Sequence, residues 1–264
     1  MTYCLGIITR AGLVMAADSR TSAGADYVSS AQKLFDLSLP RERVLLICTA
    51  GNLSMTQTIM AKIRRDIKDQ VPDNLNAMST LHDISDYIGR QTREVLDQNR
   101  HWMNRDNIDY SCSFLVGGQV RGESPELYMI YSQGNFLRAT KETPYLQIGE
   151  IKYGKPILDR TIEYEETQLD EAAKCALLSL DSTMKSNISV GPPINLALYE
   201  ADTLKLTRRC QFKEGDSYLI RIRTSWEKSL RRAFQSLPEI DWIELAEDED
   251  DLGNWLSPSN IYTA

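Results

Sequence analysis

Histidine is nearly absent from this chain of 264 residues, which contains only His82 and His101. The two lie far apart, and neither has a second histidine one helical turn away. A Ser–His–Asp triad needs histidine as its general base, and catalytic zinc is usually held by histidine ligands. We therefore expect neither triad chemistry nor a histidine-based metal site, and we assign no metal to the functional residues.

Other signatures are missing as well. The chain has no G-x-S-x-G, no P-loop and no G-x-G-x-x-G motif, so we expect no ATP hydrolysis and no cofactor. It has no apolar run long enough for a membrane helix, and no secretory signal at its start. The net charge of −7 and the pI near 5.1 disfavour nucleic-acid binding. We expect neither nucleic acid nor membrane as a partner.

Cysteine is scarce and scattered. The five cysteines are odd in number and form no C-x-x-C motif: Cys4, Cys48, Cys112, Cys175 and Cys210. This spacing is typical of buried, reduced thiols, so we expect a cytoplasmic protein without disulfides. Cys4 would share a strand face with Thr2, and we interpret it as a packed core residue.

The apolar pattern predicts both strands and helices, and therefore an α+β protein. Apolar residues at helical spacing predict helices over 59–67, 81–95, 169–180 and 225–235. β-prone segments, the first two forming a hairpin, predict strands over 3–9, 13–17, 43–49, 113–120, 126–131, 135–140, 145–148, 194–200, 204–211 and 217–222.

The C-terminal segment differs from the rest of the chain. Residues 244–251 form an acidic run, which is typical of a solvated segment. However, three of the four tryptophans, Trp226, Trp242 and Trp255, fall in the same region, which favours docking on the chain itself or on a neighbouring subunit. We expect one domain over residues 2–235 and an acidic, tryptophan-containing extension over 236–264.

Thr2 is the most informative residue, because it becomes the first residue when Met1 is removed. Its small side chain satisfies the steric condition for that removal. An N-terminal threonine combines a hydroxyl nucleophile with an α-amine that can act as its general base. A model α-amine titrates at roughly 7.7–8.0, close to the pH at which proton transfer is most effective.

Asp18, Lys33 and Gly51 follow Thr2, each after or beside a strand-like segment. Asp18 can hold Lys33 by a charge-assisted hydrogen bond. Lys33 can favour the alkoxide as an ammonium, or accept the proton of Thr2 as a neutral amine, and the sequence does not choose between these roles. Gly51 lets a backbone N–H approach a substrate closely, so it is a candidate oxyanion donor.

In this order and context, Thr2, Gly12–Arg20, Lys33 and Thr49–Gly51 resemble a proteasome β-type subunit, an N-terminal-nucleophile hydrolase. Three segments are similar to the bacterial proteasome-like Anbu family, the "ancestral β subunit": Thr2–Gly6, Gly149–Pro156 and Gly191–Asn195. The resemblance implies a four-layer αββα sandwich of two stacked antiparallel sheets flanked by helices. It also implies Thr2 as nucleophile, Asp18 and Lys33 as its activating pair, Gly51 as oxyanion donor, and Arg20 as a structural residue.

Two positions beside the expected nucleophile depart from the proteasome pattern. Proteasome β subunits have a serine where Glu150 stands, and an aspartate where Asn187 stands. The following stretch is also changed, with Val190 in place of a serine and Pro192 in place of a glycine. Together with Arg20, we interpret Glu150, Asn187 and Ser189 as supporting residues.

These residues favour a self-assembling threonine hydrolase that cleaves amide bonds, in peptides, through an acyl-enzyme on Thr2. The resemblance implies a homo-oligomeric ring or spiral of a bacterial cytoplasmic protein; it does not define an ATPase partner. One alternative is a non-peptidase amidohydrolase of the same fold that acts on a small or γ-linked amide, which the changed surroundings motivate. The other is a catalytically silent scaffold, against which the intact set of Thr2, Asp18 and Lys33 argues.

Overall fold

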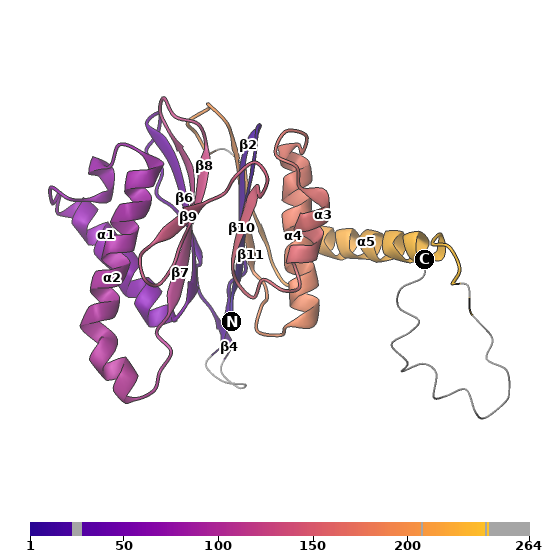
Figure 1. Cartoon of the computed structure of the whole chain (residues 1–264), viewed down its shortest axis with the longest axis horizontal. Helices are drawn as coiled ribbons and strands as arrows, with labels where there is room; N and C mark the ends of the chain where they lie inside the picture. The colour runs from indigo at the N-terminus through magenta and orange to yellow at the C-terminus, as the bar shows by residue number, and fades with distance from the viewer. Residues whose placement is uncertain (23–27, 207, 241, 243–264) are drawn as a thin grey trace, which may run out of the picture. The chain divides into compact units, whose positions relative to one another are not determined.

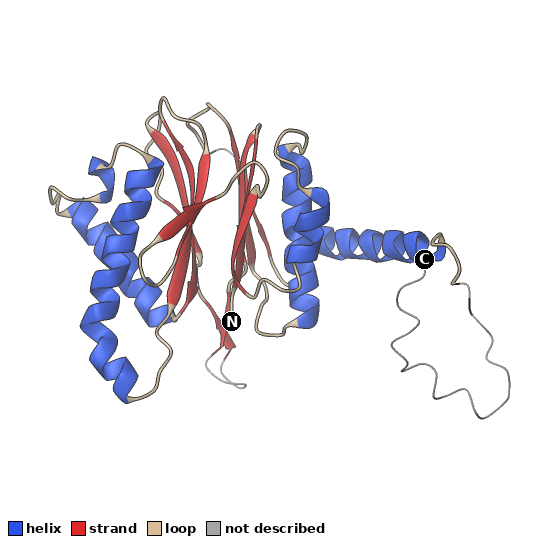
Figure 2. Ribbon diagram, viewed as in Figure 1, coloured by secondary structure: helices blue, strands red, loops and turns tan. Residues whose placement is uncertain are grey.

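The computed structural model describes residues 1–22, 28–206, 208–240 and 242, and it divides the chain into two units, Met1–Thr224 and Ser225–Ala264. In the first unit, two five-stranded antiparallel sheets face one another, with helices on the outer face of each (Figure 1). Figure 2 shows the resulting order of layers, helix–sheet–sheet–helix. The predicted α+β class and four-layer αββα sandwich are therefore confirmed.

The sheet that carries Thr2 has the strand order β10-β1-β2-β11-β12. β1 and β2 form the predicted hairpin, with Cys4 opposite Ala17, so the start of β1 and the end of β2 lie side by side at the same end of the sheet's strands. The bounds are β1 Tyr3–Thr9, β2 Gly12–Ala17, β10 Tyr145–Gly149, β11 Ile194–Glu200 and β12 Arg208–Phe212.

The second sheet has the order β5-β6-β7-β8-β9, and its central strands are buried on both faces. A separate two-stranded ribbon, β3 with β4, follows β2 in the chain. The bounds are β3 Arg20–Ser22, β4 Val28–Ser30, β5 Leu34–Asp36, β6 Arg43–Gly51, β7 Cys112–Val120, β8 Glu126–Ile130 and β9 Phe136–Arg138.

The helices begin where the sequence supplies capping side chains. Asn52 accepts hydrogen bonds from the backbone N–H groups of Ser54 and Met55, and Thr80 accepts one from Asp83, which fixes the starts of the two long helices. The helical elements of this unit are α1 Leu53–Lys68, the short 3₁₀ turn η1 Leu75–Ala77, α2 Leu81–Arg105, α3 Lys155–Thr161 and α4 Leu169–Ser186.

Three apolar clusters lie between these four layers. One cluster packs α1 and α2 on the second sheet, and another packs α3 and α4 on the first. The third lies between the two sheets and includes Cys4, Met15 and Cys48. Burying large apolar side chains is worth about 1.5–3 kcal/mol each, so this middle layer holds the two sheets together and fixes the strand ends that carry the site.

The structure corrects one predicted element. Residues 217–222, expected as a strand, form the first turns of α5, Ser217–Gln235. The Asp216 side chain accepts hydrogen bonds from the N–H groups of Tyr218 and Leu219, which initiates a helix at this point. The alternating apolar pattern of residues 217–222 predicted a strand, but the hydrogen bonds from the Asp216 cap favour a helix instead. The short elements β3, β4, β5, η1 and α3 were not predicted.

The second unit contains the remainder of α5 and the residues that follow it. Trp226 is half-buried, and five other large apolar side chains of this unit are solvent-exposed: Leu230, Phe234, Leu237, Ile240 and Trp242. The acidic run 244–251 and Trp255 lie outside the described residues, and the division expected at residue 235 remains a prediction. Within the described parts of the chain, we find no helix with the length and apolar character to cross a lipid bilayer.

Candidate active site

Thr2 immediately precedes β1 and is 8% exposed, whereas Met1 in front of it is 63% exposed. The carbonyl oxygen of Thr2 accepts a hydrogen bond of 2.8 Å from the N–H of Glu150. Gly149, with φ +87°, permits this close approach, since a Cβ there would lie 2.0 Å from the same oxygen. The nucleophile candidate is thus held by backbone contacts, while the residue to be removed is accessible.

Asp18 and Lys33 form a buried ion pair beside Thr2. The Lys33 Nζ lies 2.7 Å from Asp18 Oδ1, and the two residues are 3% and 0% exposed. The same carboxylate oxygen accepts the backbone N–H of Tyr3 at 3.0 Å, which ties the pair to the residue after Thr2. The Lys33 ammonium also donates to the carbonyl oxygen of Arg20. The structure therefore brings the three residues predicted as nucleophile and activating pair together, where β1 begins, β2 ends and β5 of the other sheet begins.

The electrostatics of Asp18 combine opposing effects. Burial raises the pKa of its carboxyl above the ordinary value, whereas the Lys33 ammonium and the N–H donors of Tyr3 and Gly191 lower it. Gly191 donates its N–H to Asp18 Oδ2 at 3.1 Å, so both carboxylate oxygens are engaged. A carboxylate with this set of partners has one orientation, and it fixes Lys33 in turn.

Arg20, predicted as a supporting residue, contacts the 188–191 loop next to the site. Its guanidinium donates to the carbonyl oxygen of Ile188 at 2.8 Å, and its backbone N–H donates to the carbonyl oxygen of Gly191. A Cβ at Gly191 would lie 2.4 Å from the Arg20 guanidinium carbon, so a larger residue there would displace the guanidinium from its present position. Arg20 thus joins the end of β2 to the 188–191 loop, which also binds Asp18.

Gly51 ends β6 and is exposed, with φ +102°. Two residues earlier, Thr49 donates its N–H to the carbonyl oxygen of Lys33 at 2.9 Å, and its own carbonyl accepts the Cys4 thiol at 3.6 Å. Gly51 therefore lies at the strand end beside the ion pair, directly before the Asn52 cap of α1. A helix N-terminus carries partial positive charge, which favours an oxyanion nearby.

The three remaining supporting residues also lie near Thr2. Glu150 is 7% exposed, and its Oε2 accepts the Asn187 side-chain amide at 3.1 Å. Asn187 is the C-cap residue that follows α4, and its Oδ1 accepts the N–H of Ser189 at 2.9 Å. This chain of contacts connects the residue opposite Thr2 with the loop that supplies Gly191 to Asp18.

Sequence reasoning missed the hydrogen-bond donors to Asp18. Neither the Tyr3 nor the Gly191 backbone N–H is visible as a side-chain motif, although Gly191 lies within a segment that resembles the family. Sequence reasoning also missed the buried contact between the hydroxyls of Tyr3 and Ser179, 2.6 Å apart, which anchors the start of β1 to α4.

Cys210 and the apolar pocket that it lines are separate from this site. All five cysteines are free, but the expectation that all are buried is wrong, because Cys175 is half-buried and Cys210 is exposed on edge strand β12.

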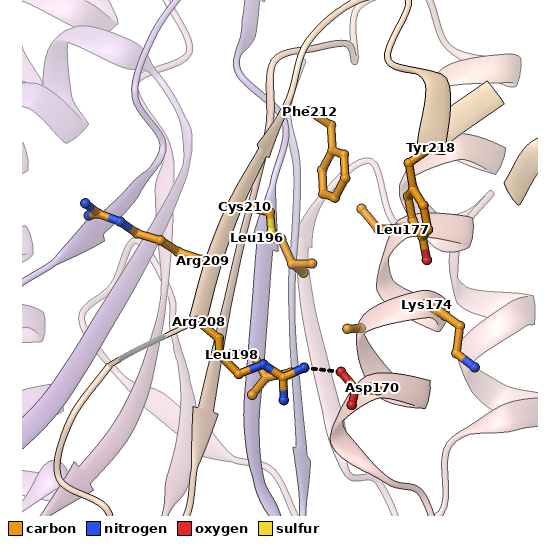
Figure 3. Close-up of a pocket in the computed structure, with 11 residues that line it drawn as sticks. Asp170, Lys174, Leu177, Leu196, Leu198, Arg208, Arg209, Cys210, Phe212 and Tyr218 are labelled. Atoms are coloured by element: carbon orange, nitrogen blue, oxygen red, sulfur yellow. Dashed lines mark hydrogen bonds and ion pairs between the residues drawn. The ribbon is translucent and has the colours of Figure 1, made fainter. Parts of the chain in front are cut away.

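Cys210 lines a pocket of about 360 Å³ between α4 and β11–β12, which also holds the ion pair of Asp170 with Arg208 (Figure 3). None of the residues that line this pocket belongs to the predicted site, and we assign the chemistry to Thr2 and its neighbours. Among the described residues, no cluster of side chains is suited to bind a metal ion.

Comparisons with known proteins agree with this geometry. The family model described as "Proteasome subunit" matches residues 2–198. Among curated proteins, "Proteasome subunit beta 2" of Nitrosopumilus maritimus is 26% identical, over 80% of this chain and 92% of its own length.

Solved structures of Anbu proteins are more similar. Anbu (ancestral β-subunit) from Yersinia bercovieri is 40% identical with a TM-score of 0.85, covering 92% of this chain and 100% of that one. The chain from the helical assembly of the Anbu complex of Pseudomonas aeruginosa is 42% identical with a TM-score of 0.84, covering 90% and 98%. The chain therefore belongs to the Anbu group of the proteasome-subunit family, with the fold of the N-terminal-nucleophile hydrolases.

Proposed function

We propose that this protein is an N-terminal threonine hydrolase that cleaves amide bonds in peptides after Met1 has been removed. The observation that carries the proposal is the buried ion pair of Asp18 with Lys33, bonded to the residue next to Thr2. A buried ion pair costs desolvation energy and contributes little net stability, so its placement beside a candidate nucleophile favours a chemical role.

In the proposed reaction, the Thr2 Oγ attacks the carbonyl carbon of the substrate amide, and its proton passes to the free α-amine of the same residue. The oxyanion that forms is stabilised by the backbone N–H of Gly51. The leaving amine takes the proton when the C–N bond breaks, which leaves an ester between the acyl group and Thr2. Water then attacks this ester, and its hydrolysis releases the acid and restores the hydroxyl.

Lys33 and Asp18 act on the nucleophile electrostatically in this scheme. An ammonium beside the Thr2 hydroxyl favours the developing alkoxide, and Asp18 keeps that ammonium in place. Arg20 holds the loop that binds Asp18, and it does not contact the substrate. Met1 blocks the reaction while present, because it converts the α-amine into an amide.

Self-assembly is part of the proposal. The Pseudomonas aeruginosa relative is described as a helical assembly, and the present chain has the exposed apolar residues of α5 available for contact. We propose a homo-oligomeric ring or spiral. The large apolar residues exposed after Thr224 are costly to leave in water, so we propose that they contribute to this contact.

A second candidate activity differs only in substrate. Glu150 and Asn187 place a carboxylate and an amide where proteasome β subunits have a serine and an aspartate, which favours small or γ-linked amides with their own charged α-amino group. A panel of fluorogenic peptides, γ-glutamyl amides and simple amides, each assayed with the wild type and with Thr2→Ala, tests both candidates. Turnover of peptides lost in Thr2→Ala supports the peptidase. Turnover confined to γ-linked or small amides supports the second candidate, and turnover that persists in Thr2→Ala overturns both.

A further inference from the structure

β12 is an edge strand whose outer side has no partner. The first sheet has the order β10-β1-β2-β11-β12, and β12 pairs with β11 alone. Apart from that ladder, no backbone hydrogen bond among the described residues involves Arg208–Phe212, and four of these five residues are exposed. An unpaired edge of this kind can accept an extended peptide as an additional strand.

A cavity lies on each face of this strand, and the two cavities differ in chemistry. On the outer face, the pocket of about 360 Å³ has apolar walls, and the rings of Phe212 and Tyr218 stack at one end of it with their centroids 5.8 Å apart (Figure 3). On the inner face, a second pocket of about 420 Å³ lies between β5 and β11–β12 and is lined by polar side chains that include Gln32, Asn195 and Gln211. Alternate residues of an extended peptide point to opposite faces of a sheet. A peptide added beside β12 would therefore present its side chains to the two pockets in turn.

The charge of this strand further defines the peptide. The chain has a net charge of −7, yet Arg208 and Arg209 lie on β12, between Lys205 and Lys213 in the sequence. Arg208 pairs with Asp170, whereas no carboxylate among the described residues lies within ion-pair distance of Arg209. Figure 3 shows the Arg209 side chain pointing away from the outer pocket, and it lines the inner one. The inner side of an added strand should therefore be acidic. A second copy of β12 does not meet that need, because like charges directly opposite destabilise a sheet.

We propose that β12 is an exosite, a substrate-binding surface outside the catalytic centre. It binds an extended polypeptide as a sixth strand of the first sheet, with apolar side chains toward the outer pocket and acidic side chains toward Arg209. The inference rests on the proposed function, because it takes the bound polypeptide to be the substrate of Thr2, and it narrows the substrate class to polypeptides rather than small amides.

The register of the sheet relates β12 to Thr2. Gln211 of β12 lies opposite Asn195, and Asn195 lies opposite Ala17, which ends β2 beside the start of β1. Gln211 also donates to Asn195 Oδ1 at 2.9 Å, and Asn195 donates to the Ser19 hydroxyl at 2.9 Å. Neighbouring strands lie about 4.7–4.9 Å apart, so an added strand, four spacings from β1, would lie roughly 19 Å from it. About six extended residues span that distance, so a polypeptide of about a dozen residues can reach both places, and shorter peptides can reach Thr2 without β12.

The test is binding of a defined peptide to the full-length Thr2→Ala variant, in which the proposed nucleophile is absent. The probe is a fluorescently labelled, eight-residue peptide that alternates phenylalanine with glutamate, and fluorescence anisotropy gives its Kd. We expect Arg209→Glu, made in the same background, to weaken binding about tenfold, because attraction becomes repulsion. The matched control Arg10→Glu reverses another exposed arginine, on the turn between β1 and β2, and should bind the peptide as before. Equal binding by the Arg209→Glu variant and its parent overturns the proposal.

Two N-methylated forms of the peptide test whether its backbone is recognised. Methylation of every second amide removes the N–H donors along one side of the extended peptide and leaves the side chains in place. Because β12 would contact only one of the two sides, we expect one form to bind about tenfold more weakly and the other to bind as the parent peptide does. Equal binding of both forms contradicts strand addition.

Hydrogen–deuterium exchange locates the bound peptide without any substitution in β12. Strand addition should slow exchange of the outward N–H groups of β12. β10, the opposite edge strand of the same sheet, should be unchanged and is the internal control. Slowed exchange elsewhere with none in β12 contradicts the assigned place. The two proposals fail separately: Thr2-dependent turnover without binding at β12 removes the exosite alone, and binding at β12 without Thr2-dependent turnover removes the hydrolase alone.

Discussion

The N-terminal site and the segment after Thr224 differ in the polarity and the solvent exposure of their side chains. At the N-terminal end, Thr2, Asp18 and Lys33 are polar and nearly inaccessible, and their charges are paired. After Thr224, Phe234 and Trp242 are apolar and 76% and 80% exposed. A buried ion pair loses hydration and adds little net stability, and apolar side chains left in water add no burial energy. Neither arrangement therefore contributes much to the fold of the single chain. The comparison is consistent with the proposed catalytic role of the first region and the proposed role of the second in association.

Thr2→Ala should have the largest effect on turnover of all the changes proposed. We expect turnover to fall to background, because the nucleophile is removed, while melting and assembly are unchanged, because Thr2 is held through its backbone. Thr2→Ser keeps a hydroxyl and should retain measurable activity. Turnover and thermal unfolding of the three proteins check this, and wild-type turnover in the alanine variant would refute the assignment.

Lys33→Ala and Asp18→Ala test whether the pair acts as one unit. Each should lower turnover by several orders of magnitude, and the double variant should be little worse than the poorer single one. Each single change also leaves a buried charge unpaired, at a cost of about 3–5 kcal/mol, so the double variant should be more stable than the sum of the two predicts. Turnover and urea unfolding are measured for the wild type, the two single variants and the double variant. Losses of turnover and of stability that simply add in the double variant would argue against a coupled pair.

The second region is tested by two truncations. Removing residues 238–264 deletes Ile240 and Trp242, each worth about 1.5–3 kcal/mol if buried between subunits, so assembly should weaken before subunit folding does. Removing only 243–264 keeps both residues and serves as the matched control. Sedimentation and melting are the measurements. An unchanged oligomer in the longer truncation would mean that this segment does not mediate association.

Labelling of the cysteines is expected to have the smallest effect on turnover. It compares how accessible the thiols of the first unit are to a reagent. Burial raises the pKa of Cys112 to about 12 and that of Cys48 well above its ordinary value, so both should be unreactive until the protein unfolds. Exposed Cys210 should react first with a thiol reagent at neutral pH, without loss of turnover. Thiol mass spectrometry against time checks the order. Early modification of Cys48 would show that the layer between the sheets opens.

The sequence predicted most of this fold because its long elements are strongly patterned. β1, β2, β6 and α2 have continuous or regularly spaced apolar residues, and capping residues mark the helix starts. The three-residue strands β3 to β5 have too few residues to show a period, and residues 217–222 were assigned the wrong period because the cap at Asp216 was not recognised.

The candidate site was predictable in its side chains and not in its backbone donors. Thr2, Asp18 and Lys33 could be named because the identity of a residue directly gives the chemistry of its side chain. The N–H groups of Tyr3 and Gly191 depend on where the chain turns, and the partner of Glu150 depends on which strand lies opposite it. Such contacts follow only from the register of β1 with β10 and from the path of the 188–191 loop.

The central claim is that Thr2 is the working N-terminus, and intact-mass spectrometry of an active preparation tests it most directly. The account predicts a mass that lacks methionine, and a further increase on Thr2 after reaction with an electrophile that traps N-terminal threonines, in parallel with loss of turnover. A mass that includes Met1 throughout a fully active preparation would contradict the mechanism.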